Sequence, residues 1–344
     1  MKILHTADVH LHSSHPQRLD ALKKVLAKAK ELQVDLLLIA GDLFDNHQEA
    51  DKLRPSLRSL FRELPLEVLA LPGNHDQHAY SRDHYFGDSF QGVTKQPFSV
   101  VDYPDTRLVL LPYFPGPILP LVPDLQKQVN PDKLNILVLH CTWSLPHLTS
   151  LDFGTPEGQL YLPVTPDLLD SLGYDLLLAG HFHSGYRMQT LPRGGTFVYS
   201  GSPSPITTRE QGRRHVNLVT HGDCRGVELP VPYLETITLP GIPGQEQALL
   251  ERLKQALALH PPNLCRPWVR IDGFTAWDEA HLNQAIKDCA RGWEIDLDFA
   301  CKGVGSILQD PLYQRLLGKL KDPQAHTLNL VLEAFSRQAA GGRA

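Results

Sequence analysis

Short apolar runs, each followed directly by aspartate, asparagine or histidine, recur through the first half of the chain. The runs are KILHTAD, VDLLLIAGDLFD, LEVLALPGNHD, NILVLHCTW and YDLLLAGHFH. Helical patterns separate the first three runs, and one of them, in residues 18–32, has a single apolar face made of Leu19, Leu22, Val25, Leu26 and Ala29. Continuous apolar runs between helices indicate strands of a parallel or mixed sheet that is covered on both faces. The sequence therefore predicts an α/β fold.

The polar residues at the ends of these runs form a candidate site. They are Asp8, His10, Asp42, Asp45, Asn74, His75, Asp76, His140, His181 and His183. Sites in open α/β sheets form beyond the carboxyl ends of the strands, so we expect these side chains at one edge. Mixed oxygen and imidazole ligands suit manganese, iron or zinc, and suit magnesium less well. Two metals about 3.5–4 Å apart could hold a phosphate and activate a water, with Asp42 as the bridging carboxylate.

Each motif also has a structural explanation when it is taken alone. The aspartates of GDLFD could cap the following helix, and PGNHD could be a turn closed by Asx hydrogen bonds. His140 could be a core histidine with satisfied hydrogen bonds, and GHFH could lie at the surface. The joint pattern favours the two-metal site, because several such motifs after successive strands rarely coincide by chance.

The charge balance bears on the class of partner. The chain has 344 residues and a formal net charge of −5 at pH 7, so a protein that coats nucleic acid through a basic surface is not expected. An enzyme whose bound metals supply positive charge stays open. The cysteines form no CxxC pair, which indicates reduced thiols in a cytoplasmic protein. No apolar run approaches the ~18 residues of a membrane span, and we expect no signal peptide.

The sequence pattern changes toward the C-terminus. Residues 101–133 are rich in proline and predict an extended loop or crossover. We predict three regions: a domain over residues 1–235 that carries the candidate site, a small α+β domain over 236–308 and C-terminal helices over 309–344. The second region contains an alternating pattern that predicts a strand with one buried and one solvated face. The buried face would carry Trp293, Ile295, Leu297 and Phe299.

The motifs DxH, GDxxD, GNHD, a lone histidine after an apolar run and GHxH together resemble those of the calcineurin-like metallophosphoesterase superfamily. More narrowly, ILHTADVHL, LLLIAGDLFD, LPGNHD and VYSGSPSPITTRE are similar to the SbcD branch, a bacterial DNA-repair nuclease that works with the SbcC ATPase. The resemblance is strong over residues 1–220 and only architectural over residues 235–344. It implies a two-sheet sandwich flanked by helices, with a small α+β capping domain.

The resemblance also implies a role for each site residue. One metal would be held by Asp8, His10 and His183, the other by Asn74, His140 and His181, and both by Asp42. His75 would bind no metal; it would lie over the phosphate and protonate the leaving oxygen, and Asp76 would orient it. The family metal is usually manganese. The implied reaction is exonuclease or endonuclease cleavage of DNA, in which a metal-bound hydroxide attacks the phosphodiester.

Two departures from the family pattern limit what this resemblance implies. Archaeal and eukaryotic relatives have a histidine that can contact DNA phosphate where this chain has Asp45, with His47 nearby. The C-terminal region that usually ends in a helical clamp for the ATPase is reduced. The last helical pattern has an apolar face that could pack on the capping domain, the favoured interpretation, or dock an SbcC-like coiled coil; its residues are Leu328, Leu330, Val331, Leu332 and Phe335.

The predicted partners are double-stranded DNA ends and hairpins, an SbcC-like ATPase and a second copy of the chain in a homodimer, with no membrane. Candidates for phosphate contact follow the GHxH run, although solvated arginine is the more common role; they are Arg187, Arg193, Arg209, Arg213 and Arg214. Two other functions stay open. An enzyme for a small phosphoester would have less need of the second domain, and a non-catalytic scaffold would not need a complete ligand set.

Overall fold

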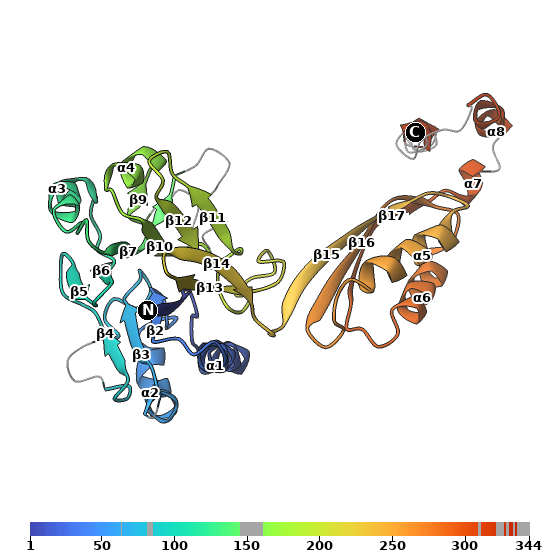
Figure 1. Ribbon diagram of the computed structural model, residues 1–344. Coiled ribbons are helices and arrows are strands. Elements are labelled where there is room, and N and C mark those ends of the chain that lie inside the picture. Colours follow the sequence, from blue (N-terminus) through green and yellow to red (C-terminus); the bar gives the residue numbers. More distant parts are fainter. Residues whose placement is uncertain are drawn as a thin grey trace. The chain divides into compact units, whose positions relative to one another are not determined.

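The structure is a computed structural model, and it describes residues 1–62, 64–80, 85–144, 161–308, 311–320, 327, 330–332 and 334–335. The chain divides into two compact units, Met1–Tyr233 and Leu234–Ala344 (Figure 1). Each unit has its own sheet structure and its own apolar core. All of the candidate site residues lie in the first unit, so the fold of that unit positions the site. None of the helices in these described ranges combines the length and the apolarity needed to cross a bilayer.

The first sheet of unit 1 has six strands. In spatial order they are β14 (Asp223–Glu228), β13 (His215–Thr220), β1 (Lys2–Thr6), β2 (Leu36–Ala40), β3 (Glu67–Leu71) and β4 (Phe90–Gly92). Strands β1 to β4 run parallel, while β13 pairs antiparallel with both β1 and β14. Because β1, β2 and β3 are parallel, their carboxyl ends meet at one edge of this sheet.

The second sheet also has six strands. They are β11 (Arg187–Thr190), β12 (Thr196–Tyr199), β10 (Leu176–Gly180), β7 (Leu134–His140), β6 (Thr106–Leu111) and β5 (Ser99–Asp102). The four central strands are parallel, and the edge strands β11 and β5 pair antiparallel. A short parallel pair, β8 (Thr142–Trp143) and β9 (Pro163–Val164), follows β7 in the chain.

The prediction of an extended loop over residues 101–133 is wrong in part. The stretch contains β6, a 3-10 turn at Leu119–Leu121 and the helix α3 (Val122–Gln126). The run TRLVLL of β6 contains no proline, so its backbone N–H groups can all join a sheet, and it pairs with β7 along its whole length.

The two sheets pack face to face, and alternate residues of one strand face the two sides of its sheet. In β2, Leu36, Leu38 and Ala40 enter the cluster between the sheets, whereas Leu37 and Ile39 face the helices. The inner cluster joins Leu36 and Leu38 to residues of the second sheet such as Ile136 and Leu178. The predicted two-sheet sandwich flanked by helices is therefore confirmed.

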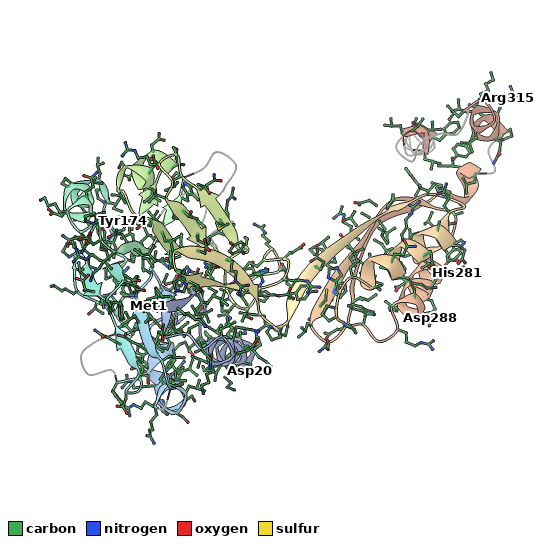
Figure 2. The ribbon with its side chains drawn as sticks, viewed as in Figure 1. Met1, Asp20, Tyr174, His281, Asp288 and Arg315 are labelled. Carbon is green, nitrogen blue, oxygen red and sulfur yellow. The ribbon has the colours of Figure 1, made fainter. Side chains whose placement is uncertain are left out.

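Helices cover the outer face of each sheet (Figure 1). The first sheet is covered by α1 (Pro16–Glu31) and α2 (His47–Phe61), and the second by α3 and α4 (Pro166–Ser171). Tyr174, labelled in Figure 2, donates its hydroxyl to the carbonyl of Leu125 at 2.8 Å and ties α3 to the segment that enters β10. These layers hold the strand ends in fixed positions.

Unit 2 is an α+β structure with a three-stranded sheet. The sheet has the order β15 (Tyr233–Gly241), β16 (Cys265–Thr275) and β17 (Asp296–Gly303), and it packs on α5 (Glu246–Leu257) and α6 (Glu279–Cys289). The alternating residues predicted for one side of a strand pack on this core; they are Trp293, Ile295, Leu297 and Phe299. The exposed His281 and Asp288 mark the solvent side of α6 (Figure 2).

The C-terminal helices begin with α7 (Gly305–Leu308) and α8 (Pro311–Leu317). Leu332 is buried in a cluster with Phe274, Val304 and Tyr313, and Val331 and Phe335 pack against it. This contact agrees with the packing interpretation of the last apolar face. Leu330 is half-exposed at 53%, and Leu328 lies outside the described residues. A capping role for unit 2 stays a prediction.

Candidate metal centre

The candidate residues lie at the carboxyl ends of strands from both sheets. Asp8 and His10 follow β1, Asp42 follows β2, His140 ends β7, and His181 follows β10. Each of these side chains is buried, with an exposed fraction of at most 2%. Ionisable groups are rarely buried unless they are paired or bind a metal. The sandwich thus gathers several such groups in one place.

Ligand-type atoms of the cluster form three overlapping groups. They are Asp8, His10 and His183; His10, Asp42 and His75; and Asp42, His140 and His181. Within each group these atoms lie within 4.8 Å of one another. Nε2 of His10 is 3.2 Å from Nε2 of His183, and Nε2 of His140 is 3.0 Å from Oδ1 of Asn74. The structure thus brings together the members of each predicted ligand set.

Asp42 lies between the two outer groups. Its Oδ2 is 3.2 Å from Nε2 of His140 and 3.7 Å from Nε2 of His10, and its Oδ1 accepts the backbone N–H of His75 at 2.9 Å. Burial raises the pKa of Asp42, but the imidazoles of His140, His10 and His75 outweigh it and hold this pKa below its usual range. The buried Oδ2 makes no hydrogen bond within the described residues. A charged oxygen in this position, with imidazoles on both sides, fits a pair of divalent cations.

Four of the site residues have a left-handed backbone. The φ angles are +55° for Asp8, +48° for His10, +50° for Asp42 and +95° for His181. An L residue in this region costs about 1–2 kcal/mol, and such strain is concentrated at functional sites. Gly41, with φ +96°, precedes Asp42, and a Cβ at this glycine would overlap the ring of His140. The turn after β2 therefore needs glycine for both its conformation and its closeness to β7.

Three histidines have an acceptor beside Nδ1, the ring nitrogen farther from the centre of the cluster. The pairs are His140 with the carbonyl of Ala40 at 2.9 Å, His183 with Oε1 of Glu210 at 3.5 Å, and His10 with Oδ1 of Asp45 at 3.7 Å. The His140 contact is a hydrogen bond, whereas Nδ1 of His183 and of His10 makes none within the described residues and faces its carboxylate at longer range. A proton on Nδ1, opposite an acceptor, leaves the lone pair of Nε2 for a metal. The three rings are therefore oriented as metal ligands require.

The protonation of the histidines differs around the site. Burial lowers the pKa of His10 and of His181, so both rings are neutral at pH 7 and able to bind a cation. Burial also acts to lower the pKa of His140, but the Asp42 carboxylate raises it to about 9. A cation that bound His140 would therefore displace a proton.

His75 differs from the other histidines of the site because it is exposed. Its ring lies 4.7 Å from the ring of His10 between centroids, and its Nδ1 lies 3.3 Å from the carbonyl oxygen of Asp45. The Asp45 side chain lies 3.3 Å from Nη1 of Arg18, which is buried and donates to the carbonyl of His10. Asp45 thus contacts two site histidines, one through its carboxylate and one through its backbone.

Asp76 has other partners than the sequence predicts. The sequence predicts that Asp76 orients His75, but its hydrogen bonds within the described residues come from the N–H groups of Gly73 and Phe44 and from the hydroxyl of Tyr80. Burial and the charge of Asp42 raise the pKa of Asp76 to about 7. Asp76 therefore fixes the loop that carries His75, and the carbonyl of Asp45 is the group that contacts the imidazole.

Three of the arginines after the GHxH run have partners within the protein. Arg214 is only 1% exposed, and its guanidinium donates to the carbonyls of His183, Ser184, Glu210, Gln211 and Gly212. Arg214 is therefore neither a solvated surface arginine, which was the favoured interpretation, nor available for phosphate contact, because its donors are used inside the protein. Arg213 pairs with Glu228 at 2.6 Å, and Arg193 with Asp170 at 3.6 Å.

Two features of the site were not predicted from sequence. Glu210 lies behind His183, in the stretch VYSGSPSPITTRE, whose irregular pattern gives no sign that this glutamate turns inward. The ring of Tyr161 lies 5.5 Å from that of His181 and 5.9 Å from that of Tyr113, so two tyrosines stand on one side of the site. Tyr113 follows β6, the strand for which the sequence pattern indicates a loop.

Comparison with known proteins gives one family match. The protein-family model described as "Calcineurin-like phosphoesterase" matches residues 1–185. The DNA double-strand break repair protein Mre11 of Methanopyrus kandleri is 25% identical over 248 residues, which are 61% of this chain and 50% of that protein. The chain thus spans about half the length of this curated relative.

Solved structures with similarity to the chain are more distant in sequence. The protein TT1561 of Thermus thermophilus is 14% identical, with 66% of this chain and 98% of that chain covered and a TM-score of 0.41. A dimetal phosphatase from Danio rerio is 12% identical, with 67% of this chain and 96% of that chain covered and a TM-score of 0.42.

Proposed function

Because the chain belongs to the calcineurin-like phosphoesterase family, which implies a hydrolase, we propose that it is a DNA nuclease of the SbcD type that depends on two metal ions. The observation that carries the proposal is the convergence of Asp8, Asn74 and four buried histidines around Asp42. The similarity to a DNA double-strand break repair protein supports DNA as the substrate.

We assign the ligands to two cations that share Asp42. The first set is Asp8, His10 and His183, and the second is Asn74, His140 and His181. The mixture of carboxylate, amide and imidazole donors suits manganese. When bound, the two cations would neutralise the phosphate and lower the pKa of a water nucleophile. The chain contributes the buried, charged Asp42 and rings whose Nε2 atoms face the cluster.

His75 is proposed to deliver a proton to the leaving oxygen. It is the exposed imidazole of the cluster, so substrate can reach it. The Asp45 carbonyl is placed to accept a hydrogen bond from Nδ1–H, which leaves Nε2 as the nitrogen that would deliver a proton to the substrate. Asp76 supports this role indirectly, because its hydrogen bond from Gly73 and its contact with Tyr80 hold the loop.

The proposal extends to the setting of the enzyme. Unit 2 would shape the access of DNA ends and hairpins to the metal centre. A homodimer and an SbcC-like ATPase partner belong to the same proposal, as does a cytoplasmic location, which the scattered cysteines and the absence of a CxxC pair support.

The test compares the wild type with His75→Ala on end-labelled duplex and hairpin DNA, with Mn²⁺ and with a chelator. We expect cleavage that needs Mn²⁺ and falls about 10²–10⁴-fold in His75→Ala, the range for loss of a general acid. The Mn²⁺ content should be unchanged, because His75 is assigned no ligand role. His78→Ala is the matched control, since His78 is also exposed, lies three residues further along and belongs to none of the three groups.

A small aryl phosphodiester, assayed in parallel, separates the alternatives. Turnover of this ester while DNA stays intact would replace the nuclease with an enzyme for small phosphoesters. Loss of Mn²⁺ from His75→Ala would make His75 a ligand and contradict its assigned role. Inactivity on both substrates with two Mn²⁺ bound would favour a scaffold, or an enzyme that requires its ATPase partner.

A further inference from the structure

Glu210 places a buried carboxylate behind one of the proposed metal ligands. Its side chain is 3% exposed, and its Oε1 lies 3.5 Å from Nδ1 of His183. The other nitrogen of that ring, Nε2, lies 3.2 Å from Nε2 of His10 and 3.7 Å from Oδ1 of Asp8. The imidazole of His183 therefore lies between Glu210 and the other ligand residues, His10 and Asp8.

The loop that carries Glu210 is built to hold this carboxylate in place. Oε2 accepts hydrogen bonds from the hydroxyl of Ser202 at 3.0 Å and the N–H of Ile206 at 2.8 Å, and Oε1 accepts the N–H and hydroxyl of Thr207, both at 3.2 Å. All four contacts donate to the two oxygens of Glu210, as they would to a carboxylate, and together they fix its position.

Arg214 joins this loop to the ligand loop. Its guanidinium donates to the carbonyl of His183 at 3.1 Å and, on the other side, to the carbonyls of Glu210 at 3.0 Å and Gln211 at 2.6 Å. Ser202 adds a second link, since its backbone N–H donates to the carbonyl of His183 at 3.3 Å while its hydroxyl donates to Glu210. Hydrogen bonds thus join the Glu210 loop to the backbone of His183.

Nδ1 of His140 has a different kind of partner from Nδ1 of His183. Its Nδ1 lies 2.9 Å from the carbonyl of Ala40, which is an uncharged acceptor. A carboxylate partner makes an imidazole a stronger ligand than a carbonyl partner does, because the negative charge stabilises the N–H on the far side of the ring. The two proposed cations are therefore supported unequally, and the charge of Glu210 acts on one of them.

We propose that Glu210 is a positioning residue of the metal centre, which orients His183, strengthens it as a ligand and so sets the affinity for one of the two cations. This inference rests on the proposed function, because it requires a two-metal site. It identifies the loop from Ser202 to Arg214 as part of the metal centre, although none of its residues belongs to a ligand group.

The test titrates the metal-free full chain with Mn²⁺ by calorimetry and follows free Mn²⁺ by electron paramagnetic resonance. For Glu210→Gln we expect one of the two affinities to fall about 10–100-fold, the usual effect of losing an outer partner of a ligand, while the other stays the same. At Mn²⁺ concentrations that give the wild type a dinuclear signal, the variant should show a mononuclear one. Ser200→Ala is the matched control: Ser200 is buried just before this loop, but its hydroxyl donates to the carbonyl of Gly201.

A His183→Ala background tests whether Glu210 acts through His183. There, adding Glu210→Gln should leave the remaining Mn²⁺ affinity unchanged, since the ring that transmits the effect is gone. A loss in that background, or a Glu210→Gln protein that binds both ions like the wild type, would overturn the proposal. Wild type that binds fewer than two Mn²⁺ would instead overturn the two-metal centre itself.

A second variant covers a failure of Glu210→Gln to fold, which circular dichroism of the metal-free protein would detect. Glu210→Asp keeps the charge but withdraws it from His183 by one methylene. We expect the same single affinity to fall by a smaller factor. A folded Glu210→Asp that lowers both affinities equally, or neither, would show that Glu210 supports the loop and does not position the ligand.

Discussion

A single glycine sets how closely the two sheets approach beneath the site. Gly180 ends β10, and a Cβ there would overlap the carbonyl oxygen of Ala40 and crowd Nδ1 of His140. We expect Gly180→Ala to lower the free energy of unfolding by about 1–3 kcal/mol, because a packed interior accepts added atoms poorly. Mn²⁺ affinity should also fall, since His140 has to move. Urea denaturation and Mn²⁺ titration measure the two effects.

Gly173→Ala is the control for this prediction. Gly173 lies just before β10 with φ +79°, and a Cβ there would meet nothing within 4 Å. It should show backbone strain alone, about 1 kcal/mol, with unchanged Mn²⁺ affinity. Equal Mn²⁺ affinities in the wild type and Gly180→Ala would refute the idea that this close packing positions His140.

The individual residues also differ in how well sequence alone predicts them. Asp42 and His140 could be placed at the site because each ends a buried apolar run, and the sheet then fixes where it lies. Glu210 and the inward turn of Arg214 could not, because they lie in an irregular loop whose contacts depend on tertiary packing. Asp76 was placed at the site, but its partner was predicted wrongly, since its carboxylate accepts the backbone N–H groups of Gly73 and Phe44, which a sequence pattern does not display.

The first turn of α2 holds the loop that carries His10. Glu49 is buried, accepts the N–H of Ser13 at 2.6 Å and pairs with Nζ of Lys52 at 2.6 Å. Burial raises the pKa of Glu49, but Lys52 and Ser13 lower it from 4.5 to about 2. Because the folded state lowers this pKa, Glu49 stabilises the fold above pH 4.5, and this stabilisation disappears as the pH falls toward 2.

We therefore expect Glu49→Gln to cost about 1–2 kcal/mol of unfolding free energy at pH 7, a value reduced for the solvent exposure of Lys52. The difference from the wild type should shrink steadily between pH 4.5 and pH 2 in chemical denaturation. Glu31→Gln serves as the control, because Glu31 pairs with Lys28 on α1 at 63% exposure and should change little at any pH. A Glu49→Gln effect that is independent of pH would show that its charge plays no part.

Helices and strands were predicted best where the apolar pattern is long. The central strands and α1 follow from continuous or helically spaced apolar residues. Strand β6 was missed because prolines on both sides of it suggested a loop. Short edge strands such as β5 and β11 have weak patterns, and pairing with a neighbouring strand, which a sequence does not display, decides their structure.

The sandwich core and the proposed metal ligands lie in the same unit of the chain. The three apolar clusters of the sandwich are made only of residues from Met1–Tyr233, and the second unit has clusters of its own. All of the proposed ligands and Glu210 lie in the first unit. Metal binding should therefore belong to unit 1 alone, whereas the choice of DNA substrate is proposed to depend on unit 2.

A chain that ends at Tyr233 tests this division. We expect it to fold and to bind two Mn²⁺ with the affinities of the full chain, because its core and its ligands are complete. It should hydrolyse a small aryl phosphodiester in the presence of Mn²⁺ at a similar rate, yet cleave duplex ends and hairpins at least about 10-fold more slowly if unit 2 shapes the access of DNA.

Calorimetry and end-labelled substrates measure these quantities, and His140→Ala in the short chain shows that the Mn²⁺ seen is at this site. A short chain that aggregates or binds no Mn²⁺ would mean that the units fold together, and unchanged DNA cleavage would remove the proposed role of unit 2.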